Sequence, residues 1–153
     1  MGLENAKPIP TLAVTDLQRA RDFYERLLGC EEYDTPTPGK DVMYRFGKDS
    51  YLYLYERPTP AGSTATVCAF SVENVEKTVE ELRGKGATFE EYDLPDMELK
   101  TVNGIAEHDG MKSAWLKDPS GNILAIDDTL AVLSRRLSGS RPGAQRPETP
   151  AQH

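Results

Sequence analysis

The feature that most constrains the fold is an internal repeat, because the chain carries one strand–helix plan twice. The segments PIPTLAVTDLQRARDFYERLLG and TVCAFSVENVEKTVEELRGKG each contain an apolar strand, a polar cap, an amphipathic helix and a closing glycine. The strands are predicted at 9–14 and 67–72, and the helix caps at Asp16 and Asn74. One such unit leaves a sheet face uncovered, so two units are expected to share a core.

Three strands are expected after each helix. They are CEEYDT, DVMYRFG and YLYLYER in the first half, and ATFEEYDL, KSAWLKD and NILAID in the second. The stretch from about 95 to 110 is predicted to be a long loop, of the kind that often forms a lid or a binding loop. The sequence DPSG at 118–121 indicates a tight turn, because proline presets φ and glycine tolerates a positive φ.

These elements predict one domain over 1–128, with a first module at about 8–57 and a second at about 65–128. A short helix is expected at 129–137, where Leu130, Leu133 and Leu137 are spaced for one face. Residues 138–153 are rich in Pro, Ser and Gly and have no apolar period, which predicts a mobile tail.

Charge and composition exclude several functional classes. The net charge of −7 argues against nucleic acid and anionic membranes as partners, because both are bound through Lys and Arg. No apolar run is long enough to span a bilayer, and the first residues do not resemble a secretory signal. The two cysteines, Cys30 and Cys68, form no metal or redox pattern, so a cytoplasmic protein is expected.

Three motifs, LAVTDLQRARDFYERLLG, AFSVENVEKTVEELRGKGA and AWLKDPSGNILAID, resemble the vicinal oxygen chelate superfamily. This superfamily includes glyoxalase I, the bleomycin-resistance proteins and the extradiol dioxygenases. The resemblance implies an α+β fold of two βαβββ modules, whose curled mixed sheets enclose a cleft. It also implies a homodimer, formed either by pairing complete chains or by swapping modules.

Strand parity predicts which side chains face that cleft, because side chains alternate across a strand. One parity is apolar and should pack against the helices: Leu12, Val14, Leu52, Leu54, Cys68, Phe70, Leu124 and Ile126. The other parity is mixed and should line the cleft: Ile9, Thr11, Ala13, Tyr51, Tyr53, Tyr55, Val67, Ala69, Ser71, Ile123, Ala125 and Asp127.

The resemblance also implies where a metal would bind, since relatives that use one carry His, Gln or Glu at four cleft positions. These positions fall here on Ile9, Tyr53, Val67 and Ala125. Three of these side chains have no lone pair to donate, and a neutral tyrosine is a poor ligand. The only histidines are His108 and His153. We therefore expect no metal and no cofactor, and we expect Ala125 to leave the cleft larger and less polar.

The cleft is expected to bind a small apolar or cationic aromatic molecule. Tyr51, Tyr53 and Tyr55 on one strand face would form a row of rings about 6.5–7 Å apart, with Trp115 nearby. Aromatic walls and the Asp127 carboxylate suit such a ligand through stacking and cation–π contacts. Metal-free bleomycin-resistance relatives sequester their ligand without chemistry, which is the role that the resemblance implies.

Two alternatives stay open. A glyoxalase-like lyase or isomerase would need an acid or base, for which His108, Glu56 and Asp127 are the candidates. A structural or interaction protein would instead have a filled cleft. A binder should lose affinity on Tyr53→Ala, whereas an enzyme should lose turnover on His108→Ala.

Overall fold

The two repeats form two four-stranded mixed sheets in the computed structural model, which describes residues 2–138. The first sheet has the order β1-β4-β3-β2 and the second β5-β10-β9-β8. In each sheet the first strand is parallel to its neighbour, and the others are antiparallel. The predicted α+β fold with two βαβββ modules is confirmed. Residues 139–153 of the expected tail lie outside the described residues.

The first module is built from one strand, one helical segment and three strands. Strand β1 spans Thr11–Val14, helix α1 spans Leu17–Arg21 and continues as the π-helix η1 at Asp22–Leu27. Strands β2, β3 and β4 span Glu31–Asp34, Asp41–Phe46 and Ser50–Glu56.

The second module repeats this plan with an excursion after its helix. Strand β5 spans Thr66–Ser71, and helix α2 spans Val75–Gly84. The excursion holds β6 at Asp93–Leu94, the 3-10 helix η2 at Pro95–Met97 and β7 at Leu99–Lys100. Strands β8, β9 and β10 span Ile105–His108, Met111–Lys117 and Ile123–Asp127, and helix α3 follows at Thr129–Leu137.

Both predicted helix caps are present. The side chain of Asp16 accepts a hydrogen bond from the backbone N–H of Arg19 at 3.1 Å, and Asn74 accepts one from Lys77 at 2.9 Å. Each cap satisfies a backbone donor that the first helical turn leaves unpaired. The internal repeat therefore includes the capping hydrogen bond at the N-termini of α1 and α2.

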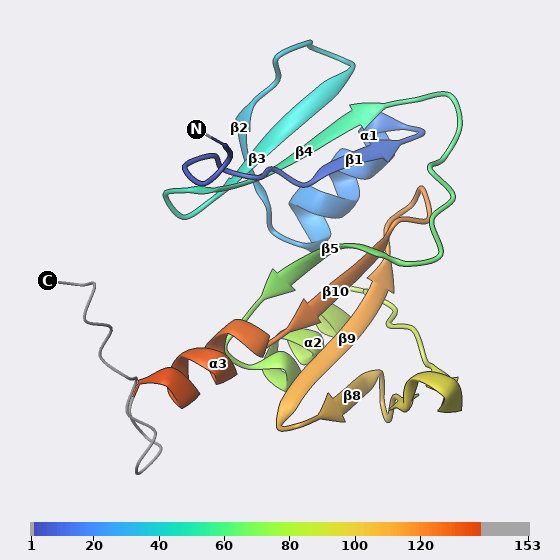
Figure 1. The fold of residues 1–153 in the computed structure, drawn as a ribbon. Helices are drawn as coiled ribbons and strands as arrows, with labels where there is room; N and C mark the ends of the chain where they lie inside the picture. Colours follow the sequence, from blue (N-terminus) through green and yellow to red (C-terminus); the bar gives the residue numbers. More distant parts are fainter. Residues whose placement is uncertain (1, 139–153) are drawn as a thin grey trace, which may run out of the picture.

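The helices cover one face of each sheet, with α1 behind the first sheet and α2 behind the second in Figure 1. The expected core parity is confirmed, since the following side chains are at most 3% exposed: Leu12, Val14, Leu52, Leu54, Leu124 and Ile126. Cys68 and Phe70 are half-buried against the same cluster. The cluster runs through both modules, so neither sheet has a separate core.

The turn at 118–121, between β9 and β10, makes hydrogen bonds to the first module. Buried Asp118 accepts hydrogen bonds from the Tyr24 hydroxyl of the first module at 2.7 Å and from the side-chain amide of Asn122 at 2.8 Å. The same amide also donates to the carbonyl of Ala13 at 2.9 Å. Burial, together with the charge of Asp118, raises the pKa of Tyr24 far above its ordinary value, so its hydroxyl stays a donor.

One part of the second module differs from the expectation. The segment 87–92 forms no strand, although Ala87 and Phe89 alternate as buried side chains. The strand that borders β9 is instead β8, which lies within the stretch expected to be a loop. Asp109 and Gly110 form the connecting turn with φ of 56° and 78°. An Asp-Gly pair between two short strands is a strong hairpin signal. It places a strand at β8, although the alternation of Ala87 and Phe89 had predicted the strand at 87–92.

The hydrogen bond between Tyr24 and Asp118 yields a prediction on stability. Tyr24→Phe removes one donor from the buried Asp118 carboxylate, so we expect the free energy of unfolding to fall by about 1–3 kcal/mol. Urea denaturation followed by circular dichroism measures this loss. Tyr33→Phe is the matched control, because Tyr33 is exposed. Equal stability of the two variants would show that the Tyr24–Asp118 contact does not hold the modules together.

Candidate functional site

The open face of the first sheet carries the predicted row of tyrosines. Tyr51, Tyr53 and Tyr55 are all half-buried on β4. The rings of Tyr53 and Tyr55 stack with centroids 6.1 Å apart and planes at 13°. Tyr51 meets the edge of Tyr33 from β2 at 5.3 Å. The face is therefore an aromatic surface built by two strands.

The ring of Tyr53 is fixed by a buried carboxylate. Its hydroxyl donates to Asp41 at 2.6 Å, and the backbone N–H of Thr37 donates to the other oxygen at 2.7 Å. Asp41 is only 5% exposed. Burial acts to raise the pKa of Asp41, but the two donors outweigh it and hold the pKa below its ordinary value. The same hydrogen bond raises the pKa of Tyr53, so Tyr53 is a neutral donor rather than a phenolate.

The open face of the second sheet carries a cavity of about 270 Å³ that contains two predicted residues, His108 and Trp115. Trp115 is braced by Tyr92, whose ring meets it edge-on at 5.5 Å. The walls come from the residue after η2, from β7, β8 and β9, and from the start of α3: Glu98, Leu99, Lys100, Ala106, Glu107, His108, Met111, Ser113, Trp115 and Thr129.

The chemistry of this cavity is aromatic and apolar with a charged rim. Trp115, Met111 and Leu99 supply apolar surface, and Glu98 and Glu107 supply carboxylates against the single ammonium of Lys100. Such walls suit a flat molecule that carries a positive charge. His108 is the last residue of β8 and is exposed, so it lies on a strand and not in the loop that the sequence predicted.

The four positions where metal-using relatives carry ligands do not fit a metal. Ile9 lies outside β1 and is 41% exposed, and Thr11 is the register partner of Tyr53. Val67 packs against the core, and Ala125 is 5% exposed. The expectation that Ala125 would leave open space is wrong, because its side chain is buried. Within residues 2–138, no group of three or more His, Cys, Asp or Glu side chains could hold a metal ion.

The two carboxylates considered as a catalytic pair each have a local partner. Glu56 accepts the backbone N–H of Leu17 at 2.9 Å, at the beginning of α1. It also pairs with Lys40 at 3.8 Å. Asp127 accepts the backbone N–H of Thr129 at 3.2 Å, at the beginning of α3. They belong to different sheets, and each supports the start of a helix.

Several site residues were missed by the sequence analysis. Met111 and Ser113 share the parity of Trp115 on β9. Strand alternation applied to KSAWLKD would have included Ser113, whereas Met111 lies one residue before that predicted strand. Asp41 had no comparable signal, because its contact with Tyr53 depends on the register of β3 against β4. Glu98 and Leu99 come from the η2–β7 excursion, which the sequence did not resolve into elements.

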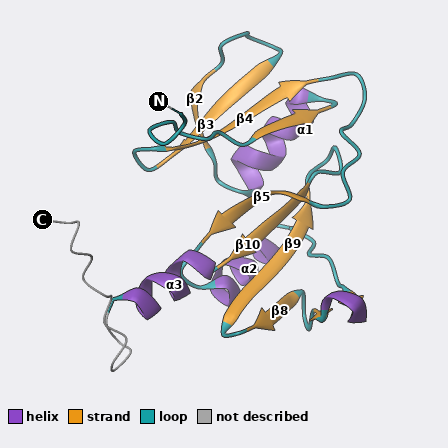
Figure 2. Cartoon of the chain, viewed as in Figure 1, coloured by secondary structure: helices purple, strands orange, loops and turns teal. Residues whose placement is uncertain are grey.

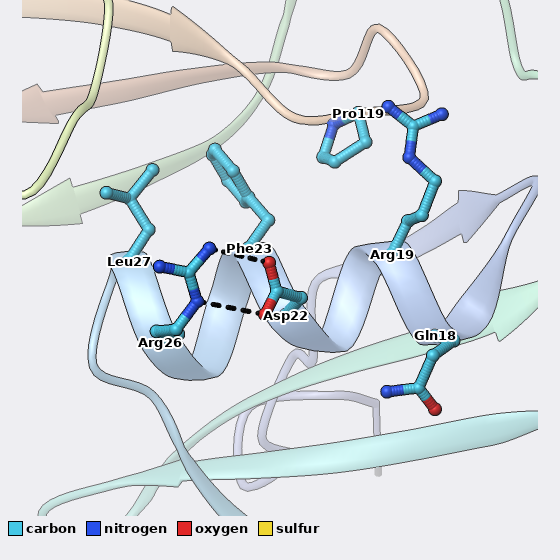
Figure 3. Close-up of a pocket in the computed structure, with 7 residues that line it drawn as sticks. All are labelled: Gln18, Arg19, Asp22, Phe23, Arg26, Leu27 and Pro119. Carbon is cyan, nitrogen blue, oxygen red and sulfur yellow. Dashed lines mark hydrogen bonds and ion pairs between the residues drawn. The ribbon is translucent and has the colours of Figure 1, made fainter.

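A second hollow, of about 400 Å³, lies on the outer face of α1 and η1 against Pro119 (Figure 3). Its charged groups are largely occupied with each other, since Arg26 donates to both carboxylate oxygens of Asp22 at 3.0 and 2.9 Å. Phe23 and Leu27 provide its apolar surface. None of the predicted binding residues line it, so we centre the candidate site on the cavity at His108 and Trp115.

Comparison with solved structures agrees with this fold. Lactoylglutathione lyase from Agrobacterium tumefaciens is 18% identical over 80% of this chain and 92% of that chain, with a TM-score of 0.56. A glyoxalase/bleomycin resistance protein from Catenulispora acidiphila DSM 44928 is 22% identical over 79% and 96%, with a TM-score of 0.57. TnmS3, an antibiotic binding protein from Streptomyces sp. CB03234, is 20% identical over 79% and 93%, with a TM-score of 0.56.

No curated protein matches the chain significantly in sequence. The family model of the Glyoxalase/Bleomycin resistance protein/Dioxygenase superfamily matches residues 9–126, which is most of the chain. The match covers most of both modules and the 118–121 turn at their contact. The chain therefore belongs to the Glyoxalase/Bleomycin resistance protein/Dioxygenase superfamily.

Proposed function

We propose that the chain binds a small aromatic molecule, apolar or cationic, in the cavity at Trp115 and sequesters it without a metal. The observation that carries this proposal is the meeting of the braced Trp115 ring with the carboxylates of Glu98 and Glu107 in one cavity. A volume of about 270 Å³ favours a ligand of one or two rings. The antibiotic-binding role of TnmS3, which shares the fold, supports a binder.

Metal independence rests on the chemistry of the residues at the four family positions. Ile9, Val67 and Ala125 offer no donor atom, and the hydroxyl of Tyr53 is already a donor to Asp41. A ligand would then be held by stacking, apolar contact and charge alone. Removal of divalent ions should leave its affinity unchanged.

The tyrosine row is proposed as an accessory surface for the same class of ligand. Asp41 holds the Tyr53 ring parallel to Tyr55, so a flat molecule meets an ordered aromatic face. Tyr51 extends the row toward β2. Since these rings belong to the first sheet and the cavity to the second, Tyr53 and Trp115 can be tested separately.

The alternative function is a metal-independent lyase or isomerase with His108 as acid or base. One observation favours it, namely that His108 shares the cavity with Ser113 and Glu107. His108→Ala would then abolish turnover of an identified substrate and leave binding nearly intact. If the protein is only a binder, there is no turnover for His108→Ala to abolish.

We propose a cytoplasmic location for the binder on the basis of its free thiols, and a homodimer on the basis of its resemblance to the superfamily. No helix within residues 2–138 is long and apolar enough to cross a membrane. Cys30 and Cys68 are free thiols, and burial raises the pKa of Cys30 to about 12, so this cysteine behaves as a small apolar side chain. Free buried thiols are usual in reducing compartments.

Binding is tested with N-methylquinolinium, a flat cation of two rings, and with neutral 1-methylnaphthalene as the charge control. Trp115 is the only tryptophan, so its fluorescence reports on the cavity. We expect saturable quenching by the cation. Calorimetry should show affinity about tenfold lower for Trp115→Ala, equivalent to about 1.4 kcal/mol.

Tyr53→Ala is the matched aromatic control for that experiment. We expect it to weaken quinolinium binding less than Trp115→Ala does. A larger loss for Tyr53→Ala would move the site to the tyrosine row. Unsaturable quenching in the wild-type protein, with no heat of binding, would contradict the proposed cation-binding cavity.

The Tyr53–Asp41 contact yields a prediction on pH. The pKa of Asp41 in the folded protein is below its ordinary value of 3.8, so this contact stabilises the fold above that pH. The stabilisation is lost as the pH falls through the lower, folded-state pKa. Tyr53→Phe removes a donor to the carboxylate and should raise the pKa of Asp41. Carbon-13 NMR titration measures this, and an unchanged pKa would contradict the assigned role of Tyr53.

A further inference from the structure

A further cavity, of about 240 Å³, lies where the helix-covered sides of the two modules meet. Its apolar walls are Leu28, Cys30 and Phe46 from the first module and Phe70, Val72 and Leu116 from the second. We call it the junction cavity. Figure 2 shows the helix of the first module ending close to β5, the strand that carries Phe70. The cavity therefore exists only where the two modules are in contact.

The walls of the junction cavity are aromatic and aliphatic. The rings of Phe46 and Phe70, one from each module, have centroids 5.8 Å apart and planes at 57°. Leu28, Phe46, Phe70 and Val72 are half-buried and pack against the common core. Where they face the cavity, these side chains lack partner atoms for dispersion contacts. A ligand with apolar surface would supply those contacts.

The polar groups of the junction cavity come from one face of α2: Thr78, Glu81 and Lys85, the last at its C-cap. The Thr78 hydroxyl already donates to the carbonyl of Asn74 at 2.9 Å. Glu81 and Lys85 are exposed and carry opposite charges, so together they favour neither sign of ligand. Within residues 2–138, no buried side-chain nitrogen or oxygen lacks a hydrogen-bond partner. The interior therefore offers a polar ligand no unpaired partner.

We propose that the junction cavity binds an uncharged apolar molecule of one ring, such as a substituted benzene. Apolar cavities of about 150 Å³ bind benzene, so this volume accommodates a ring with small substituents. A charged ligand would lose hydration here without gaining a fixed partner. The site is separate from the cavity at Trp115, where carboxylates outnumber ammonium groups, and it does not depend on the function proposed above.

Three fluorinated probes with the same ring test the class of ligand: neutral 4-fluorotoluene, cationic 4-fluorobenzylamine and anionic 4-fluorobenzoate. In fluorine NMR of the full chain, we expect saturable binding of 4-fluorotoluene with a dissociation constant on the order of 1 mM. The two charged probes should bind at least about tenfold more weakly. Unsaturable behaviour of 4-fluorotoluene, or equal affinity for a charged probe, would overturn the proposal.

The two free cysteines provide a matched pair of variants. Cys30 lines the junction cavity, whereas Cys68 packs against the core outside it. Cys30→Met adds a flexible apolar chain that fills part of the cavity, so we expect 4-fluorotoluene to bind at least about tenfold more weakly. Cys68→Met makes the same change elsewhere and should leave the affinity within about twofold. Circular dichroism checks that both variants are folded, and wild-type affinity in folded Cys30→Met would contradict the site.

A measurement on the wild-type chain locates the probe without any substitution. Intermolecular nuclear Overhauser effects should connect 4-fluorotoluene with the methyl groups of Leu28 and Val72, one from each module. Effects to Leu99 and Met111 instead would place the probe in the cavity at Trp115 and overturn the proposal. Neither outcome bears on quinolinium binding, which is measured by Trp115 fluorescence and calorimetry.

Discussion

The structure depends on one buried carboxylate at the joint between the modules. Asp118 is 4% exposed, and an ionised group in that position must be fully hydrogen-bonded to be tolerated. Its partners are the Tyr24 hydroxyl, the side-chain amide of Asn122 and backbone N–H groups of its own turn. Because Tyr24 comes from the first helix and the turn from the second module, satisfying this carboxylate fixes how the two sheets sit together. The shared hydrophobic core then packs on both sides of that joint.

This arrangement explains why the candidate site lies on the open sheet faces. The helix-covered faces are filled by the core, so the tyrosine row and the cavity at Trp115 both lie on the opposite faces. On the first sheet that face is a tyrosine row ordered by Asp41, and on the second it is a cavity walled by Trp115. Ile9, Val67 and Ala125 offer no donor atom for a metal, so the proposed recognition uses stacking and charge.

Much of the fold could be predicted because the sequence repeats its signals. The caps at Asp16 and Asn74 and the alternation in β1, β4, β5 and β10 depend only on local chemistry. The second module's excursion was predicted less well, since Ala87 and Phe89 alternate as buried side chains like those of a strand, whereas the segment 87–92 forms only isolated backbone hydrogen bonds, such as that from Glu90 to Trp115. The candidate site was predicted in part. Trp115 and His108 were named from the sequence, whereas their common cavity depends on β8 pairing with β9.

The measurement that tests the central claim most directly is quinolinium calorimetry on one preparation before and after exhaustive chelation, with its metal content determined by elemental analysis. Binding to Trp115 without a metal predicts substoichiometric metal and the same dissociation constant in both samples. Stoichiometric metal whose removal abolishes binding would contradict the account. The ligands would then have to come from side chains outside the four positions occupied by Ile9, Tyr53, Val67 and Ala125.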